Sequence, residues 1–369
     1  MTSEPPTVED GKNSSFSMLQ LDEVFNPATR DAHFNDIRHV ILPNGLRMEY
    51  AMHGEVDAPE KVVMIMGMQG EKESWLPLVS TFLHPENGTT SKFQLVTFDN
   101  RGVGGSDKPW GWYSTTKMAR DALMLMDHLR WPRAHIVGAS MGGMIAQELA
   151  YAAPERVASL ALMVTSPGFR QGGWPGKAQM SSYLAMVRNM FIPTRHRIAS
   201  TMIYCLFPED FLQETIETPS KTPSEDTEDA TAIQTTHSVL YKHHMRRLGQ
   251  VKMSISGMLG HYTAVLFHNM QRDRLQVVAD ADFPIMITGA KQDRMLHPKN
   301  TDFLLRTLKS KQTQAIIFEN SGHDVHVQHR LEVSEALDKL FASGTCAAPA
   351  VAPPAPTKHA KKSKKHRKH

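Results

Sequence analysis

The fold is decided by residues 134–143, which read AHIVGASMGG. The mostly apolar residues Ala134 to Val137 are typical of a buried strand, and Ser140 follows them among small residues. A sharp turn from strand to helix at this point lifts the Ser140 hydroxyl above a sheet. Gly138 and Gly142 suit such a turn, because side chains there would collide with neighbouring backbone. The pattern predicts a nucleophilic serine at a helix N-terminus, where a positive partial charge favours a developing anion. A purely structural turn is the alternative.

Outward from this stretch, apolar runs alternate with segments of helical periodicity. The runs are continuous enough for strands covered on both faces: 61–66, 93–98, 159–164, 284–288 and 315–318. Between them, Met118 to Leu129 places apolar residues on one helix face. Nearer the start, Asn44-Gly45 between two apolar runs predicts a β-hairpin. The alternation predicts an α/β fold with a mostly parallel central sheet flanked by helices.

The alternation breaks between residues 168 and 282, a stretch rich in Met and His with a helical pattern. We expect this stretch to form a helical lid insertion, with a mobile loop in the polar segment 218–226. A second packed domain without a lid function is the alternative. The expected organisation is a flexible lead-in (1–35), a core in two parts (36–167 and 283–343), the lid between them (168–282), and an Ala/Pro-rich linker with a polybasic tail (344–369).

The net charge of +3 is unevenly distributed. From Cys346 onward there are seven Lys or Arg residues and no acids, which leaves the rest of the chain at −4. This tail is a solvated charge run, or it contacts acidic lipid, RNA or the nuclear import machinery. Two cysteines fit a reducing compartment, and no apolar run reaches the roughly 18 residues of a membrane span. Since the start does not resemble a secretory signal, we expect a cytoplasmic protein that is also a candidate for the nucleus.

Five landmarks, in this order, give the chain a family resemblance. Each follows an expected strand: Met66-Gly67-Met68-Gln69-Gly70, Asp99 to Ser106, Gly138 to Gly143, Thr288 to Asp293, and Ser321-Gly322-His323. Together they resemble the α/β-hydrolase superfamily over roughly residues 36–343, in particular its serine-nucleophile, esterase- and lipase-like branch with an inserted lid. The resemblance implies the order nucleophile, acid, base along the chain.

A serine hydroxyl needs a base to remove its proton, and the base needs a third group to orient it. His323 follows the last expected strand, where the resemblance places the base. Asp293 follows the run 284–288 and lies between Ser140 and His323 in sequence, so it is the candidate acid. The alternatives are His326 as the base, and Asp324 or Asp302 as the acid.

A tetrahedral intermediate needs two N–H donors for its oxyanion. Met141, directly after the nucleophile, is the first candidate, and the resemblance assigns Met68 as the second. Many relatives carry His-Gly where this chain has Met66-Gly67, so a polar anchor beneath this loop is missing. Gln69 is a candidate for an additional side-chain donor.

No cofactor or metal is expected. The Gly-rich segment Asp99 to Ser106 lacks the spacing of a phosphate or dinucleotide loop, so we expect Asp99 and Arg101 to tie it down by hydrogen bonds. The histidines at His243-His244, and His261 with His268, lack nearby ligands at metal-binding spacing.

These residues predict a serine hydrolase that cleaves an ester, thioester or amide of a small apolar acyl compound through an acyl-enzyme. Lid methionines are candidates for an adaptable apolar pocket: Met180, Met186, Met190, Met202, Met253 and Met258. Acyl transfer to an alcohol and hydrolysis of a carbon–carbon bond remain open with the same triad. So does a non-catalytic binding protein on a hydrolase scaffold. Dehalogenase and epoxide hydrolase activities are disfavoured, because relatives with those activities carry Asp at the nucleophile position.

Overall fold

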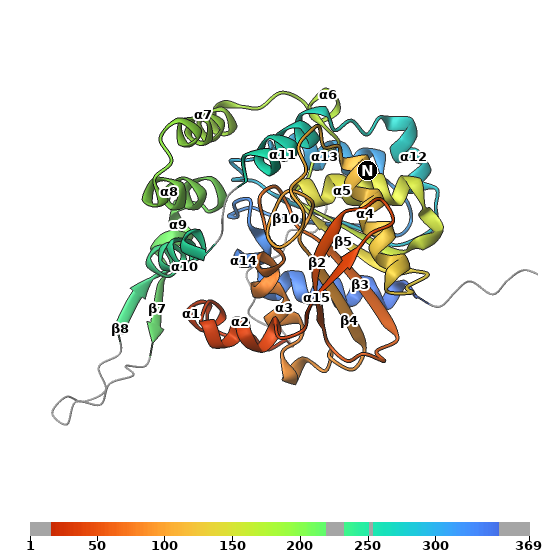
Figure 1. Ribbon diagram of the computed structural model, residues 1–369, viewed down its shortest axis with the longest axis horizontal. Helices are drawn as coiled ribbons and strands as arrows, with labels where there is room; N and C mark the ends of the chain where they lie inside the picture. The colour runs from red at the N-terminus through yellow and green to blue at the C-terminus, as the bar shows by residue number, and fades with distance from the viewer. Residues whose placement is uncertain (1–15, 219–231, 251–253, 347–369) are drawn as a thin grey trace, which may run out of the picture.

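A mostly parallel sheet of eight strands forms the centre of the part of the chain that the computed structural model describes, residues 16–218, 232–250 and 254–346 (Figure 1). The strand order is β1-β2-β4-β3-β5-β6-β9-β10. β2 runs antiparallel to both of its neighbours, and all the other neighbouring pairs are parallel. The strands are β1 (Ile37–Ile41), β2 (Arg47–His53), β3 (Glu60–Ile65), β4 (Phe93–Phe98), β5 (Ala134–Ala139), β6 (Val157–Met163), β9 (Ile285–Ala290) and β10 (Thr313–Phe318). The predicted fold class and the predicted hairpin of β1 and β2 are confirmed.

Helices cover both faces of the sheet. Side chains along its central strands accordingly alternate between two cores. In β3, Val63 and Ile65 belong to one core, whereas Val62 and Met64 belong to the other. The first core includes side chains of α4 (Thr115–His128), α5 (Met141–Ala152), α12 (Arg272–Ala279) and α13 (Lys299–Thr307). The second includes those of α3 (Leu76–Phe82) and α15 (Arg330–Ser343). Burial on both faces explains the continuous apolar runs of the sequence.

Between β6 and α12 the chain leaves the sheet and forms a group of helices, here called the insertion (168–271). Helix α10 packs against α8, and α8 packs against α7. The insertion lies over one end of the sheet (Figure 1). Its elements are α6 (Phe169–Gly172), α7 (Lys177–Phe191), α8 (Arg195–Leu206), α9 (Glu209–Gln213), the antiparallel pair β7 (Thr215–Thr218) and β8 (Ala232–Thr235), α10 (Thr236–Gln250) and α11 (Ile255–Phe267). Of the segment expected to be a mobile loop, 218–226, all but Thr218 lies outside the described residues.

The N-terminal region differs from the flexible lead-in that we expected to extend to residue 35. Helices α1 (Leu21–Val24) and α2 (Pro27–His33) are ordered, and Leu21, Val24 and Phe34 are buried. These side chains join a third core with Phe207 of the insertion and with further residues of α8, α9 and α10. The apolar residues among the polar ones of this region therefore serve to pack it against the insertion. Residues 1–15 lie outside the described part.

Four short elements complete the described chain: η1 (Lys72–Trp75), η2 (Pro85–Asn87), η3 (Pro154–Arg156) and α14 (Val325–Gln328). Among the described residues, no helix combines the length and the apolar character needed to cross a bilayer.

Candidate active site

Ser140 lies in the tight turn that joins β5 to α5, with φ 56° and ψ −122°. A positive φ is strained for a residue with a Cβ atom, and such strain persists only where the surroundings enforce it. They do so here by close backbone approach. A Cβ at position 142 would lie 1.9 Å from the carbonyl oxygen of Ile65, and one at position 138 would lie 2.4 Å from that of Gly142. Both glycines are thus required by the turn that presents Ser140.

Asp293 and His323 form a buried hydrogen-bonded pair. His323 Nδ1 lies 2.8 Å from Asp293 Oδ2, and Asp293 Oδ1 accepts hydrogen bonds from the N–H groups of Met295 (2.7 Å) and Leu296 (2.8 Å). An N–H at Nδ1 leaves Nε2 of the neutral ring as a proton acceptor. Burial lowers the pKa of His323, but the Asp293 carboxylate outweighs it, so this pKa lies above its usual value. A neutral His323 is therefore a stronger base than a free imidazole.

The alternative acids and base occupy other positions. Asp302 lies exposed on α13, and the carboxylate beside His323 Nδ1 is that of Asp293. The Asp324 N–H donates to the carbonyl of Leu206, where Asp324 precedes α14. His326 is buried against the indole of Trp75, with ring centroids 5.3 Å apart. The geometry thus distinguishes Asp293 from Asp302 and Asp324 as the partner of His323.

The loop after β3 lies directly against Ser140. A Cβ at Gly67 would lie 3.0 Å from Ser140 Cβ, so Gly67 is positioned beside Ser140, and Met68 lines the same cavity as Ser140. Gln69 has a positive φ of 60°. Its N–H donates to Nδ1 of His261 (3.0 Å), and His261 Nε2 donates to the carbonyl of Arg101 (2.8 Å). This arrangement requires a neutral His261, and burial lowers the pKa of His261 to about 4.

Sequence reasoning missed the role of His261 in this loop. The residue belongs to α11 of the insertion and lies 192 positions from Gln69 in the chain. No local pattern signals a contact of that range. His261 provides the polar anchor that the sequence lacks at Met66.

A buried cluster of charged side chains supports the loop after β3, at the residue that follows it, Lys72. The Lys72 N–H donates to Asp99 Oδ1 (2.7 Å), and its ammonium contacts Asp99 Oδ2 (3.1 Å) and Glu49. The Gly105 N–H donates to Asp99 Oδ2 (2.8 Å), and Arg101 makes a two-pronged contact with Asp121 (2.6 and 2.7 Å). Asp99 and Arg101 thus tie down the Gly-rich segment by hydrogen bonds, as predicted.

A mostly apolar cavity of about 460 Å³ opens over Ser140. Ser140, His323, Gly67 and Met68 line it, together with many side chains of the insertion. Of the methionines expected to line a pocket, Met186 and Met202 do so. Met253 and the side chain of Met190 lie outside the described part of the chain. The cavity has the size and apolar character of a small-molecule site.

The insertion is hydrogen-bonded to the loop that carries Asp293. Gln179 Nε2 of α7 donates to the Asp293 carbonyl (2.5 Å), and the Tyr183 hydroxyl donates to that of Met295 (2.7 Å). Farther along, Arg247 of α10 forms ion pairs with Glu71 and Glu73 beside the 66–71 loop. Helices α7 and α10 therefore contact the loops on both sides of Ser140.

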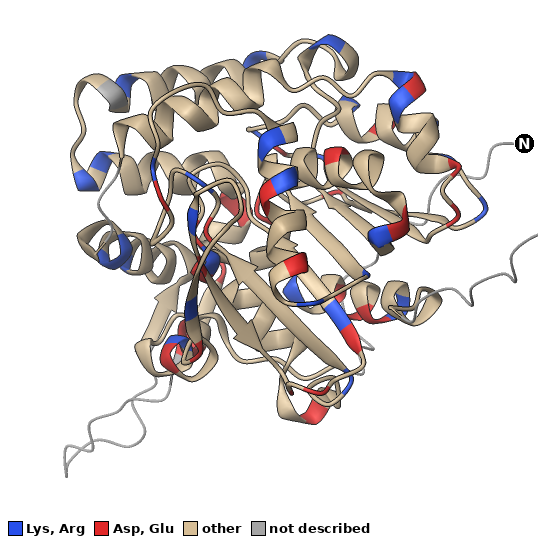
Figure 2. Cartoon of the chain, turned by 45° about the vertical axis from the view of Figure 1, so that its right-hand side comes forward, with Lys and Arg blue, Asp and Glu red and all other residues tan. Residues whose placement is uncertain are grey.

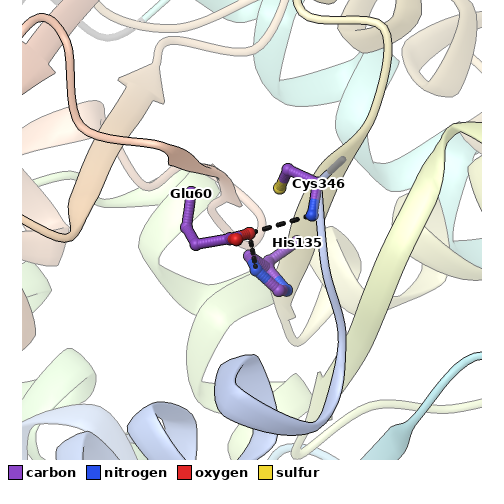
Figure 3. Close-up of side chains that lie close together, drawn as sticks. All are labelled: Glu60, His135 and Cys346. Atoms are coloured by element: carbon purple, nitrogen blue, oxygen red, sulfur yellow. Dashed lines mark hydrogen bonds and ion pairs between the residues drawn. The ribbon is translucent and has the colours of Figure 1, made fainter. Parts of the chain in front are cut away.

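One group of potential metal ligands is found in the described residues: Glu60, His135 and Cys346 lie close together (Figure 3). Glu60 begins β3, His135 lies near the start of β5, and Cys346 follows α15. Their polar atoms already form hydrogen bonds with other atoms of the protein. His135 contacts Ser159 Oγ (2.8 Å) and Glu60 Oε2 (3.0 Å), and the Cys346 N–H donates to Glu60 Oε2 (2.9 Å). Burial raises the pKa of the Cys346 thiol to about 12, whereas a metal ligand must be a thiolate. We assign this cluster the role of holding the end of the described chain to the sheet.

Comparisons with known proteins agree with this geometry. A family model described as alpha/beta hydrolase fold matches residues 61–330. The 3-oxoadipate enol-lactonase 2 of Acinetobacter baylyi is 28% identical over 149 residues, which are 40% of this chain and 52% of that protein. The chain spans about half the length, or less, of the curated relatives that it matches first.

Solved structures show the same fold at low sequence identity. The enol-lactonase from Burkholderia xenovorans LB400 is 18% identical with a TM-score of 0.63, over 83% of this chain and 100% of that chain. An esterase from Exiguobacterium antarcticum is 19% identical with a TM-score of 0.63, over 83% of this chain and 99% of that chain. At such identities the likeness concerns the fold alone.

Proposed function

The chain belongs to the α/β-hydrolase fold family, and on this premise we propose that it is a serine hydrolase that cleaves a carboxylic ester of a mostly apolar acyl compound. The observation that carries the proposal is that His323 lines the same cavity as Ser140 while its Nδ1 lies 2.8 Å from Oδ2 of the buried Asp293. Three further features support it: the strained turn at Ser140, the loop packed against the hydroxyl, and the apolar walls.

In the proposed reaction, His323 Nε2 takes the proton of the Ser140 hydroxyl as its oxygen attacks the ester carbonyl. The N–H groups of Met68 and Met141 hold the oxyanion that forms. His323 returns the proton to the departing alcohol, which leaves an acyl group on Ser140. Water, deprotonated by His323, then releases the acid and restores the serine. Asp293 keeps the proton on Nδ1 throughout and stabilises the transient imidazolium.

The choice of an ester follows from the cavity and from the relatives. An apolar cavity with few polar groups suits an uncharged acyl compound better than a peptide or a phosphate ester. The relatives from Acinetobacter and Burkholderia are named enol-lactonases, and a lactone is an internal ester. The structural neighbour from Exiguobacterium is named an esterase.

The test is fluorophosphonate labelling of the protein and of its Ser140→Ala variant, followed by a chain-length series of p-nitrophenyl esters. We expect covalent labelling and ester hydrolysis of the wild type, and a loss of roughly 10⁴-fold or more in kcat for the variant. Ser114→Ala is a matched control, because Ser114 caps α4 away from the cavity. If the folded wild type is not labelled and hydrolyses no ester, the proposal is wrong, and the non-catalytic scaffold becomes the better hypothesis.

A further inference from the structure

Helix α7 presents an apolar stripe to solvent. Met180, Leu184, Val187 and Phe191 follow one another at helical spacing, and the exposed fractions of Leu184 and Phe191 are 64% and 80%. Trp174, in the segment before α7, is 88% exposed. Soluble proteins expose single apolar side chains, but a contiguous stripe with an exposed tryptophan marks a surface that contacts something apolar.

A second apolar stripe lies on α11. On α11, Ile255, Leu259 and Leu266 are exposed on one face, and the neighbouring Phe267 packs on Trp112 with ring centroids 5.3 Å apart. Val187 of α7 and Leu266 of α11 are 47% and 58% exposed, and both also line the cavity. Each stripe therefore includes a side chain that borders the cavity. We call α7, Trp174 and the exposed side of α11 the docking face.

The charge beside the α7 stripe has one sign. Residues 168–208 contain five Lys or Arg residues and no Asp or Glu. Along α6 and α7, at the upper edge of the molecule, the cartoon in Figure 2 colours Lys and Arg positions and no Asp or Glu position. Arg170, Lys177, Arg188 and Arg195 are exposed, and none of these four takes part in an ion pair with another described residue. Their charges remain available for an anionic partner.

From these observations we propose that the docking face binds the surface of a bilayer that contains anionic phospholipid. Exposed Leu, Phe and Trp on a helix with Lys and Arg beside them suit the boundary between headgroups and acyl chains. The apolar side chains enter that boundary, while the cations pair with lipid phosphates and carboxylates. A second protein would need acidic residues and a surface of complementary shape. A bilayer with anionic lipid supplies negative charge and an apolar interior without a specific fit. Docking itself does not depend on hydrolysis.

The experiment is sedimentation of the full-length protein with vesicles of phosphatidylcholine, alone or mixed with phosphatidylserine. We expect binding to the mixed vesicles that weakens as NaCl concentration rises. Leu184→Asp with Phe191→Asp should lower the partition coefficient by about tenfold or more, since two apolar anchors become charged. Ile41→Asp with Val56→Asp is the matched control, because these side chains are 73% and 70% exposed elsewhere on the surface. Circular dichroism verifies the fold of each variant.

Further variants distinguish the docking face from the active site, the polybasic tail and a dimer contact. Ser140→Ala should bind the mixed vesicles as the wild type does, which keeps this test independent of hydrolysis. A chain ending at Cys346 should retain binding. If that truncation abolishes binding, the polybasic tail is responsible and the proposal is wrong. It is equally wrong if the Leu184/Phe191 variant binds like the wild type. A dimer in light scattering that this variant dissociates, without vesicle binding by the wild type, would assign the face to a second copy of the chain instead.

Discussion

The sheet and the insertion differ in what surrounds their apolar side chains. Every residue of β4, β5, β6 and β9 is buried, whereas α7 exposes large apolar side chains to solvent and also lines the cavity. The sheet is covered by its own helices, so its geometry is determined within the chain. The insertion instead is bonded to loops of the core, through Gln179, Tyr183, His261 and Arg247. We infer that the core provides the reacting groups, and that the insertion adjusts the loops that hold them.

The largest expected effect tests the contribution of the core. Asp293→Asn places an amide opposite His323 Nδ1 and favours the wrong tautomer of the imidazole, so we expect kcat to fall by about 10⁴-fold. The measurement is steady-state hydrolysis of the best p-nitrophenyl ester. Asp302→Asn makes the same chemical change at an exposed position of α13 and should leave kcat unchanged.

Equal effects of Asp293→Asn and Asp302→Asn would contradict the assignment of the acid. A fall in kcat with unchanged thermal unfolding would support it, because the structural hydrogen bonds from the Met295 and Leu296 N–H groups can still reach the amide oxygen.

The second effect concerns the support beneath the 66–71 loop. Lys72→Met removes the ammonium that contacts the fully buried Asp99 and leaves a carboxylate without its cation. Breaking a buried pair in this way lowers the free energy of unfolding by about 3–5 kcal/mol. Urea denaturation measures the change, and Lys92→Met, at an exposed position, should cost less than about 0.5 kcal/mol. A small effect at Lys72 would mean that the loop does not depend on this cluster.

The third effect lies where the insertion meets the core. His261→Leu deprives the Gln69 N–H of its acceptor, which costs about 1–3 kcal/mol for a buried donor. Because Gln69 adjoins Met68, we expect kcat to fall by about tenfold or more with little change in KM. His268→Leu is the control: His268 is also buried and bonds Thr115, away from the 66–71 loop. If both variants lose stability and neither loses kcat, His261 has only a structural role.

The same comparison explains how much the sequence predicted. Strands β3, β4, β5, β6, β9 and β10 lie within a few residues of the predicted runs, since burial on both faces leaves a continuous apolar signal. The turn at Ser140 was predictable because the backbone approaches that require Gly138 and Gly142 are local. The candidacy of Asp293 and His323 came from the family resemblance, which gives the order nucleophile, acid, base along the chain. The structure adds that the two residues follow neighbouring parallel strands, β9 and β10.

What the sequence could not predict depends on contacts between distant segments. Leu21, Val24 and Phe34 are too widely spaced to form a pattern of their own, and their packing became evident only with the insertion in place. His261 looked like one histidine among nineteen until α11 placed it against Gln69. Lys72 also follows a polar run, and only the folded chain brings it to Asp99.

The smallest effect tests whether the insertion merely covers the cavity or also positions the acid. Tyr183→Phe removes the hydroxyl that donates to the Met295 carbonyl, two residues from Asp293, and one such hydrogen bond contributes about 1 kcal/mol. Tyr204→Phe removes a hydroxyl that contacts Ser181 on the exposed side of the same helices, and it should change neither stability nor kcat. We expect kcat to fall several-fold for Tyr183→Phe alone, because the loop that holds Asp293 gains freedom. A change in unfolding free energy without a change in kcat would mean that α7 stabilises the cavity wall but leaves the His323–Asp293 pair to the core.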